Sequence, residues 1–356
     1  MTKTRFDAAR EGFRMPAEWE PQAATWLGWP VQENREELWG PHYAAVCEAF
    51  ALLARTIAKY QRCIVTAYTP LVAQARALCG PTVEVLPLAV EDNWLRDCGA
   101  IFLVNDDRVQ QLATRFRFNA WGEKYTPYDG CAQLAVDMAR LAGVPLQSSD
   151  MVLEGGSFYS DGQGTLLTTE SCLLHPNRNP HLTRADIEAE LRRMLGVTKV
   201  IWLPGNPAEV ETNGHVDIIA SFIAPGRILF NAAEPDQGEY YRCMQENRRA
   251  LELATDARGR RFEILELPVP RGHDTWGTER FCASYANYVL VNGAVISSSY
   301  GVANDALARE AFARAFPDRL VELLPLAAIS VGGGGAHCSS QQQPMLGNRL
   351  AVTPRN

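Results

Sequence analysis

The sequence predicts an α/β protein in which about five similar supersecondary units form a ring. Apolar residues make up 47% of the 356-residue chain and charged residues 21%, the usual balance of a globular protein with a large core. Helical and strand periodicity alternate along the chain. The later predicted helices begin near residues 71, 128, 183, 237 and 303, at intervals of 57, 55, 54 and 66 residues. This even spacing favours repeated units, and an open α/β sheet is the alternative.

The first part of the chain predicts two helix–strand pairs. Residues 41–60 carry apolar side chains at helical spacing, and the segment RCIVTAY (62–68) after them has the composition of a strand. A short helix over 70–80 ends at a glycine, and residues 83–90 form the next strand.

The middle of the chain predicts two longer helices. Residues 128–143 form a helix closed by glycine. The helix over 183–196 begins with Thr183 and Asp186 in the spacing of a capping box and also stops at a glycine. Residues 199–204 then predict a strand.

The last part of the chain predicts two hairpins, a helix and a strand. The hairpins lie over 222–230 and 288–296, and the second has an Asn-Gly turn that suits type I′. Residues 303–316 are helical in pattern, and residues 320–326 form a strand after them.

Charge and cysteine content restrict the partners and the compartment. The net charge of −7 argues against nucleic acid or an anionic membrane as partner and favours cationic ligands. No apolar run approaches the ~18 residues of a membrane span, and the first residues lack the apolar segment of a secretory signal. The nine cysteines include no C-x-x-C pair, as expected for reduced thiols. We therefore expect a cytoplasmic protein.

Three polar stretches carry candidate site residues. After Gly214 the pattern is extended, so His215 and Asp217 would share one face of a strand, where one can move protons and the other hold positive charge. Asp97 follows a polar turn, and Glu154 precedes two glycines. Taken singly, each has a structural alternative. His215 and Asp217 could be a structural pair, Asp97 part of a surface ion pair, and Glu154 a solvated acid in a loop.

A fourth stretch, VGGGGAHCSSQQQP (331–344), sets Cys338 apart from the other cysteines by its glycine-rich flank. The chain has neither a phosphate-binding loop nor a zinc signature such as H-E-x-x-H.

Together these stretches resemble the agmatine deiminases, a family of the guanidine-modifying superfamily that includes the bacterial-type peptidylarginine deiminases. The resemblance covers nearly the whole chain and implies a five-bladed pseudo-symmetric α/β propeller of ββαβ-type units, one catalytic domain over 1–356, around a central active-site well. It implies hydrolysis of agmatine to N-carbamoylputrescine and ammonia in putrescine biosynthesis, without metal or cofactor, and a homodimer. The segments that carry it are MPAEWEPQAATWLGWP, DNWLRDCGAIFLV, FNAWGEKY, LEGGSFYSDGQGTLLTTESCLLHPNRNPHLT, ETNGHVD, ASYANYVLVNGAVI and GGGGAHCSSQQQP.

The resemblance implies a role for five residues in catalysis. Cys338 matches the nucleophile and His215 the general acid and base. Asp97 and Asp217 match the two carboxylates that hold the guanidinium, and Glu154 matches the acid near the histidine. A soft, anionic thiolate suits attack on the flat, permanently charged guanidinium carbon. The two carboxylates would hold that carbon in place for the attack.

Three further residues match substrate-binding positions. Glu211 matches an acid for the amine tail and Trp94 a site-lining aromatic, while Asn213 stands where the family has aspartate. The family's loops also differ here at three positions near the nucleophile, namely Ala336, Ser339 and Ser340.

The glycines before Cys338 fit a planar cation lying against a strand that carries the thiol, because glycine allows close approach and positive φ. Adjacent residues on an extended chain point oppositely, so we interpret His337 as structural.

Three alternatives stay open. The substrate could be another guanidine, such as arginine, a peptidylarginine or a specialised metabolite, for which Arg96 or Arg178 could bind a carboxylate. The same cysteine, histidine and acids could hold a metal in a metallohydrolase. A non-catalytic binding protein is the last alternative.

Overall fold

The computed structural model describes residues 5–33 and 36–347, and within them the strands form five separate sheets. Four sheets repeat one pattern: an antiparallel pair, then a helix, then a third strand parallel to the second. Their strands are β5 (Ile101–Asn105), β6 (Gln111–Arg117) and β7 (Leu146–Val152); β8 (Phe158–Ser160), β9 (Thr165–Thr169) and β10 (Lys199–Leu203); β11 (Ala220–Ala224), β12 (Arg227–Ala232) and β13 (Glu263–Pro268); β14 (Val289–Val291), β15 (Ala294–Ser298) and β16 (Leu320–Leu324). The short β1 (Phe13–Arg14) pairs with β5.

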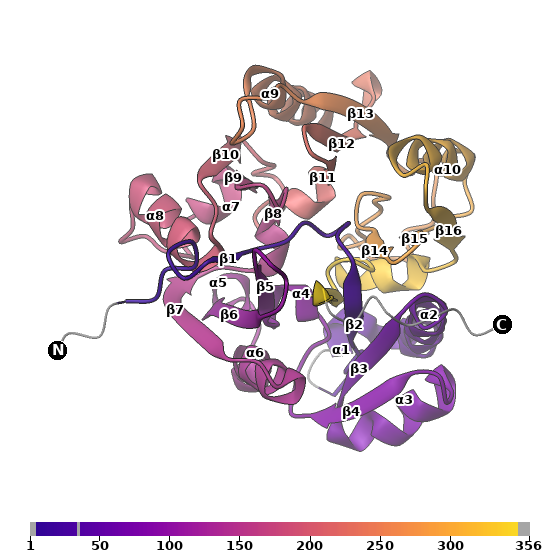
Figure 1. Ribbon diagram of the computed structural model, residues 1–356. Helices are drawn as coiled ribbons and strands as arrows, with labels where there is room; N and C mark the ends of the chain where they lie inside the picture. The colour runs from indigo at the N-terminus through magenta and orange to yellow at the C-terminus, as the bar shows by residue number, and fades with distance from the viewer. Residues whose placement is uncertain (1–4, 34–35, 348–356) are drawn as a thin grey trace.

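The fifth sheet joins segments from both ends of the chain. β17 (Ser340–Pro344) pairs antiparallel with β2 (Gln22–Gly28), and β3 (Arg62–Tyr68) and β4 (Glu84–Leu88) follow in parallel. This sheet therefore repeats the pattern of the others and links the last unit to the first. Figure 1 shows the five sheets around a common centre.

The long helices lie on the outside of this arrangement (Figure 1). They are α2 (Tyr43–Ile57), α3 (Val72–Cys79), α6 (Asp129–Ala142), α8 (Arg184–Leu195), α9 (Glu239–Leu253) and α10 (Asn304–Ala315). The single-turn helices are α1 (Glu36–Trp39), α4 (Leu95–Cys98), α5 (Ala120–Glu123) and α7 (Glu170–Leu173).

The core consists of apolar clusters between the sheets and these helices. The largest cluster contains Trp26, Trp29, Trp39 and Phe50, none of them more than 1% exposed. Fully burying a side chain such as Phe50 contributes about 1.5–3 kcal/mol relative to leaving it in water. Such burial holds the strands, and the candidate site residues lie in turns and a short helix next to them.

The mixed α/β class and the order of elements agree with the sequence prediction, and each long predicted helix is present within about three residues of its predicted bounds. Two local predictions were wrong. Residues 216–218 form a 3-10 turn before β11, so His215 and Asp217 do not lie on a strand. In the β14–β15 turn only Gly293 has a positive φ, because Asn292 uses its side chain to bond both the N–H and the carbonyl of Gln22, so the turn is not type I′.

The described helices do not meet the requirements of a membrane span. Within residues 5–33 and 36–347, no helix combines the length and the apolar character that crossing a membrane requires.

The predicted capping box of α8 is present and gives a test of the fold. The Thr183 hydroxyl accepts from the Asp186 N–H at 3.2 Å, and the Asp186 carboxylate accepts from the Thr183 N–H at 2.9 Å. Thr183→Ala should lower the free energy of unfolding by about 1 kcal/mol in chemical denaturation, because the Asp186 N–H in the first turn loses its hydrogen-bond acceptor. Thr183→Ser should stay near wild type, and equal stability of all three proteins would contradict the role of the cap.

Candidate active site

Cys338 lies in a turn directly before β17. The sequence prediction of a strand at this residue was wrong, because the strand begins at Ser340. Only 7% of Cys338 is exposed, so the thiol belongs to the interior and is reached through cavities.

The glycine run lets neighbouring side chains come close to this turn. A Cβ on Gly334 would lie 2.6 Å from the Trp94 ring, and a Cβ on Gly335 would lie 2.7 Å from the Asn287 amide oxygen. Gly333 instead has a positive φ of 89°, and a Cβ there would make only ordinary contacts, 3.5 Å from Glu211 Cγ and 3.7 Å from the Arg280 carbonyl oxygen. The run therefore serves close packing of Trp94 and Asn287 as well as backbone geometry.

Asp217 is the acid in direct contact with the thiol. The Cys338 Sγ lies 3.3 Å from Asp217 Oδ2 and accepts a hydrogen bond from the Asn287 amide at 3.0 Å. His337 Nδ1 lies 3.0 Å from the same Asp217 oxygen, so His337 and Cys338 do not point apart as predicted. The other oxygen, Oδ1, is buried and has no hydrogen-bond partner among the described residues.

A buried ion-pair network connects Asp217 through His337 to Glu18 and Arg96. His337 Nε2 lies 3.0 Å from Glu18 Oε1, and Arg96 donates to the same oxygen at 3.2 Å. Sequence reasoning missed Glu18 and Asn287, although both lie in segments that carry the family resemblance. Arg96 is committed to this network, and its side chain is only 4% exposed.

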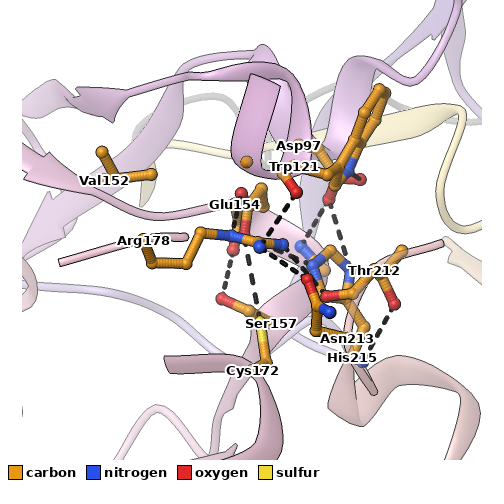
Figure 2. A network of polar contacts seen from close by, with 12 residues as sticks. Asp97, Trp121, Val152, Glu154, Ser157, Cys172, Arg178, Thr212, Asn213 and His215 are labelled. Carbon is orange, nitrogen blue, oxygen red and sulfur yellow. Dashed lines mark hydrogen bonds and ion pairs between the residues drawn. The ribbon is translucent and has the colours of Figure 1, made fainter. Parts of the chain in front are cut away.

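His215 sits between two acids on the other side of the site (Figure 2). Its Nε2 lies 3.4 Å from Glu154 Oε2, and its Nδ1 lies 3.8 Å from Asp97 Oδ1. Arg178 donates to Glu154 Oε1 at 2.7 Å and so compensates its buried charge. Asp97 in turn accepts from the Trp121 indole N–H at 2.9 Å.

Gly156 marks the point where these groups converge. A Cβ on this residue would lie 2.7 Å from His215 Nδ1, 2.8 Å from Asp97 Oδ1 and 3.2 Å from Asp217 Oδ2. The Gly156 N–H also donates to Asp97 at 2.9 Å. The histidine and both aspartates therefore meet at a position that only glycine leaves free.

Burial and charge set the protonation of the thiol and the imidazole. Burial raises the pKa of Cys338 well above its usual value, and the carboxylates of Asp217 and Asp97 raise it further. Burial alone would lower the pKa of His215, but Asp97, Cys172 and Glu154 outweigh it, and the pKa lies well above the ordinary value. At neutral pH the site thus holds a thiol and an imidazolium.

The acids respond differently to the same burial. Burial raises the pKa of Asp97, and the nearby imidazole of His215 only partly offsets this. Burial would also raise the pKa of Glu154, but Arg178 and His215 bring it down to about 2. For Asp217 the hydrogen bond and charge of His337 outweigh burial and lower the pKa.

Two cavities reach Cys338. The first, which we call the narrow cleft, encloses about 350 Å³. The second, which we call the wide cavity, encloses about 1660 Å³. Leu38, Trp94, Asp97, Trp121, Tyr125 and glycines 332 and 334 line the narrow cleft alone, whereas both cavities share Glu211, Thr212, Gly333 and Cys338.

Two of the three predicted substrate-binding residues line the narrow cleft. Trp94 and Glu211 line the narrow cleft, where Glu211 accepts from the Tyr125 hydroxyl at 2.6 Å and lies 3.4 Å from Arg280 Nε. Asn213 is not among the lining residues of either cavity described here. Its side-chain oxygen accepts from Arg178 at 2.8 Å, so we expect it to position Arg178 rather than to contact a ligand.

One group of the described residues has the spacing of a metal site. Glu154, Cys172 and His215 offer ligand atoms within 4.8 Å of one another. The group differs from the predicted metal alternative, because it includes neither Cys338 nor Asp217. One Glu154 oxygen is already bound to Arg178, which leaves the other for such an ion.

The fold and the site together define a guanidine-modifying protein, and comparisons agree. Residues 14–344 match the family of Porphyromonas-type peptidyl-arginine deiminases, and the chain belongs to this family. It is 37% identical to the agmatine deiminase of Pseudomonas aeruginosa (strain LESB58), across 94% of this chain and 96% of the relative. The predicted family is thereby confirmed.

Solved structures give the same result. The agmatine deiminase of Enterococcus faecalis superposes with a TM-score of 0.91 at 35% identity, over 96% of this chain and 99% of that one. An agmatine deiminase of C. jejuni with substrate bound superposes with a TM-score of 0.84 at 27% identity, over 94% and 97% of the two chains.

The Glu154–His215 contact predicts the pH response of the imidazole. Glu154→Gln removes a negative charge that raises the pKa of His215, so His215 should lose its proton at lower pH than in the wild type. A nitrogen-15 NMR titration of His215 measures this shift directly. Glu170→Gln, a change in the exposed pair with Arg184, is the control. An unchanged or raised pKa in Glu154→Gln would contradict the coupling.

Proposed function

We propose that this chain hydrolyses agmatine to N-carbamoylputrescine and ammonia through a covalent intermediate on Cys338. The observation that carries the proposal is the convergence of a buried thiol, an imidazolium and two carboxylates beside a narrow cleft. The agmatine deiminases among the relatives, full-length at more than one third identity, support the same activity and make the enzyme a hydrolase of a guanidine C–N bond.

The site suits a guanidinium because it concentrates buried negative charge. Asp217 Oδ1 has no partner among the described residues and can accept a guanidinium N–H. Asp97 lies beside the narrow cleft and can accept another. A carboxylate–guanidinium contact at about 4 Å is worth roughly 4 kcal/mol at an effective dielectric near 20. Two such contacts fix the plane and present the central carbon to Cys338.

The bound cation also activates the thiol. In the free site the carboxylates of Asp217 and Asp97 oppose thiolate formation, because like charges repel. A guanidinium between them reverses the local charge, and the Asn287 N–H already points at the sulfur. Cys338 therefore releases its proton to solvent when substrate is bound, and the sulfur then adds to the guanidinium carbon.

His215 serves both halves of the reaction. Its Nδ1, which has no hydrogen-bond partner among the described residues, protonates one –NH2 of the tetrahedral adduct. The C–N bond breaks, ammonia leaves, and a thiouronium remains on Cys338. The neutral imidazole then takes a proton from water, the oxygen adds to the carbon, and the C–S bond breaks. The proton left on the added oxygen passes to the leaving sulfur, so the ureido product, the Cys338 thiol and the imidazolium result.

The tail of the substrate would lie along the narrow cleft. Glu211 is placed to attract the primary ammonium, and Trp94 to cover the apolar chain. Two predicted carboxylate binders, Arg96 and Arg178, are already paired with Glu18 and Glu154, which disfavours arginine. Arg280 lies beside Glu211 and could pair with the carboxylate of a bound arginine. Arginine is therefore included as a substrate in the assay.

The larger features of the prediction belong to the same proposal. The five ββαβ sheets support a five-bladed pseudo-symmetric propeller that acts as one catalytic domain. A cytoplasmic location and a homodimer remain predictions.

Activity tests the proposal directly. Chelator-treated protein should convert agmatine to ureido product and ammonia, and should leave arginine and a blocked arginine peptide largely unchanged. Turnover of only arginine or the peptide would indicate another guanidine substrate. Loss of activity on chelation would indicate the metal alternative, and no ureido product from any guanidine would indicate a binding protein.

The nucleophile has its own test. Cys338→Ser should lower kcat by about four orders of magnitude or more, because a hydroxyl lacks the nucleophilicity of a thiolate. Calorimetry should still detect agmatine binding. Cys243→Ser, at a half-buried thiol on α9, is the matched control and should keep wild-type activity. Substantial turnover by Cys338→Ser would refute the assignment.

The tail contact predicts a substrate-dependent effect. Glu211→Gln should raise KM for agmatine about tenfold, and should change KM for butylguanidine, which lacks the amine, much less. The reason is that only agmatine brings an ammonium to this carboxylate. Steady-state kinetics with both substrates measure the difference, and equal effects would exclude the tail role.

A further inference from the structure

The covalent mechanism requires a second path to the sulfur, and this inference rests on the proposed function. After attack, the carbon chain of the substrate stays attached to Cys338 and fills the narrow cleft. Aromatic side chains of Trp94, Trp121 and Tyr125 line that cleft, which leaves little room beside the chain. Ammonia must nevertheless leave, and water must arrive, before the chain is released.

The wide cavity also reaches the sulfur of Cys338. It is lined by both Cys338 and Asp217, and it shares only part of its wall with the narrow cleft. Asp217 and Cys338 are the groups beside the reacting carbon. A molecule in the wide cavity can therefore meet this carbon while the narrow cleft is occupied.

The wall of the wide cavity offers hydrogen-bond acceptors without partners. Asn231 lines it and is only 2% exposed. Its amide nitrogen donates to the Ile218 carbonyl at 3.0 Å and to the Tyr240 hydroxyl at 3.1 Å, while its Oδ1 has no partner among the described residues. Asp217 Oδ1 is unpaired in the same sense. Water and ammonia are small N–H or O–H donors that satisfy such acceptors.

We propose that the wide cavity carries ammonia out and water in, while agmatine binds through the narrow cleft. Ammonia leaves along the acceptors of Asp217 and Asn231 once the C–N bond has broken. Water returns by the same path, gives a proton to His215 and adds its oxygen to the thiouronium carbon. The C–S bond then breaks and the electron pair returns to the Cys338 sulfur.

Nucleophile trapping tests this path. Hydroxylamine or the larger methoxyamine, added with agmatine, should reach the intermediate through the wide cavity. Its nitrogen adds to the thiouronium carbon, His215 takes the proton, and the C–S bond breaks to give an N-hydroxy- or N-methoxyguanidine. The ratio of trapped to ureido product, measured by mass spectrometry, reports access to the intermediate independently of enzyme concentration.

Two variants narrow the wide cavity from different parts of its wall. Ala283→Phe adds a ring inside it, and Thr278→Trp adds one at a half-exposed position. Thr275→Trp makes the matched change at an exposed residue of the same segment, outside the lining described for either cavity. Either narrowing variant should lower the methoxyamine trapping ratio about fivefold. It should lower the hydroxylamine ratio less and leave kcat/KM for agmatine within about twofold. Thr275→Trp should match the wild type.

The outcomes are separable. Unchanged trapping ratios in both folded variants would overturn the path, as would a wild-type enzyme that makes ureido product but no trapped product. A fall in kcat/KM with unchanged ratios would mean that agmatine itself uses the wide cavity. A wild-type protein that makes no ureido product from agmatine would instead refute the proposed function.

Discussion

The site depends on one buried carboxylate, that of Asp217. One of its oxygens contacts His337, Asn287 and the sulfur of Cys338, and the other has no partner among the described residues. The bonded oxygen fixes the position of the acid against the thiol. The other oxygen can accept a hydrogen bond, and a guanidinium N–H can donate it. The negative charge of Asp217 also raises the pKa of the Cys338 thiol. A bound cation offsets this charge, so substrate binding and activation of the sulfur occur together.

Holding several acids in a dry interior requires matched positive charge. Glu154 is paired with Arg178, and Glu18 with Arg96 and His337, and all of these side chains are nearly or fully buried. Breaking a buried pair by removing one partner costs about 3–5 kcal/mol, because the other charge is left uncompensated. The two arginines are therefore parts of the scaffold, and the remaining acids keep their charge for a ligand.

Sequence alone predicted much of this and missed what depends on long-range contacts. The helix α8 was predicted with its cap, because Thr183 and Asp186 interact within one turn. Glu18 and His337 are 319 residues apart, and no local pattern connects them. The 3-10 turn at 216–218 was taken for a strand, since its apolar residues alternate as in a strand while the contacts of Asp217 determine the backbone. Asn287 was missed for the same reason, because its contacts with Asp217 and Cys338 join residues 70 and 51 positions apart.

The geometry also distinguishes Cys338 from the other thiols near the site. Cys172 lies 4.0 Å from Glu154 Oε2, close to His215, but it is fully buried and lines neither cavity among the described residues. Cys282 lines the wide cavity, but it lies outside the narrow cleft. Cys338 lines both cavities and accepts an N–H bond on its sulfur. A nucleophile that must meet a substrate from one side and water from another needs that combination, and of these three thiols only Cys338 has it.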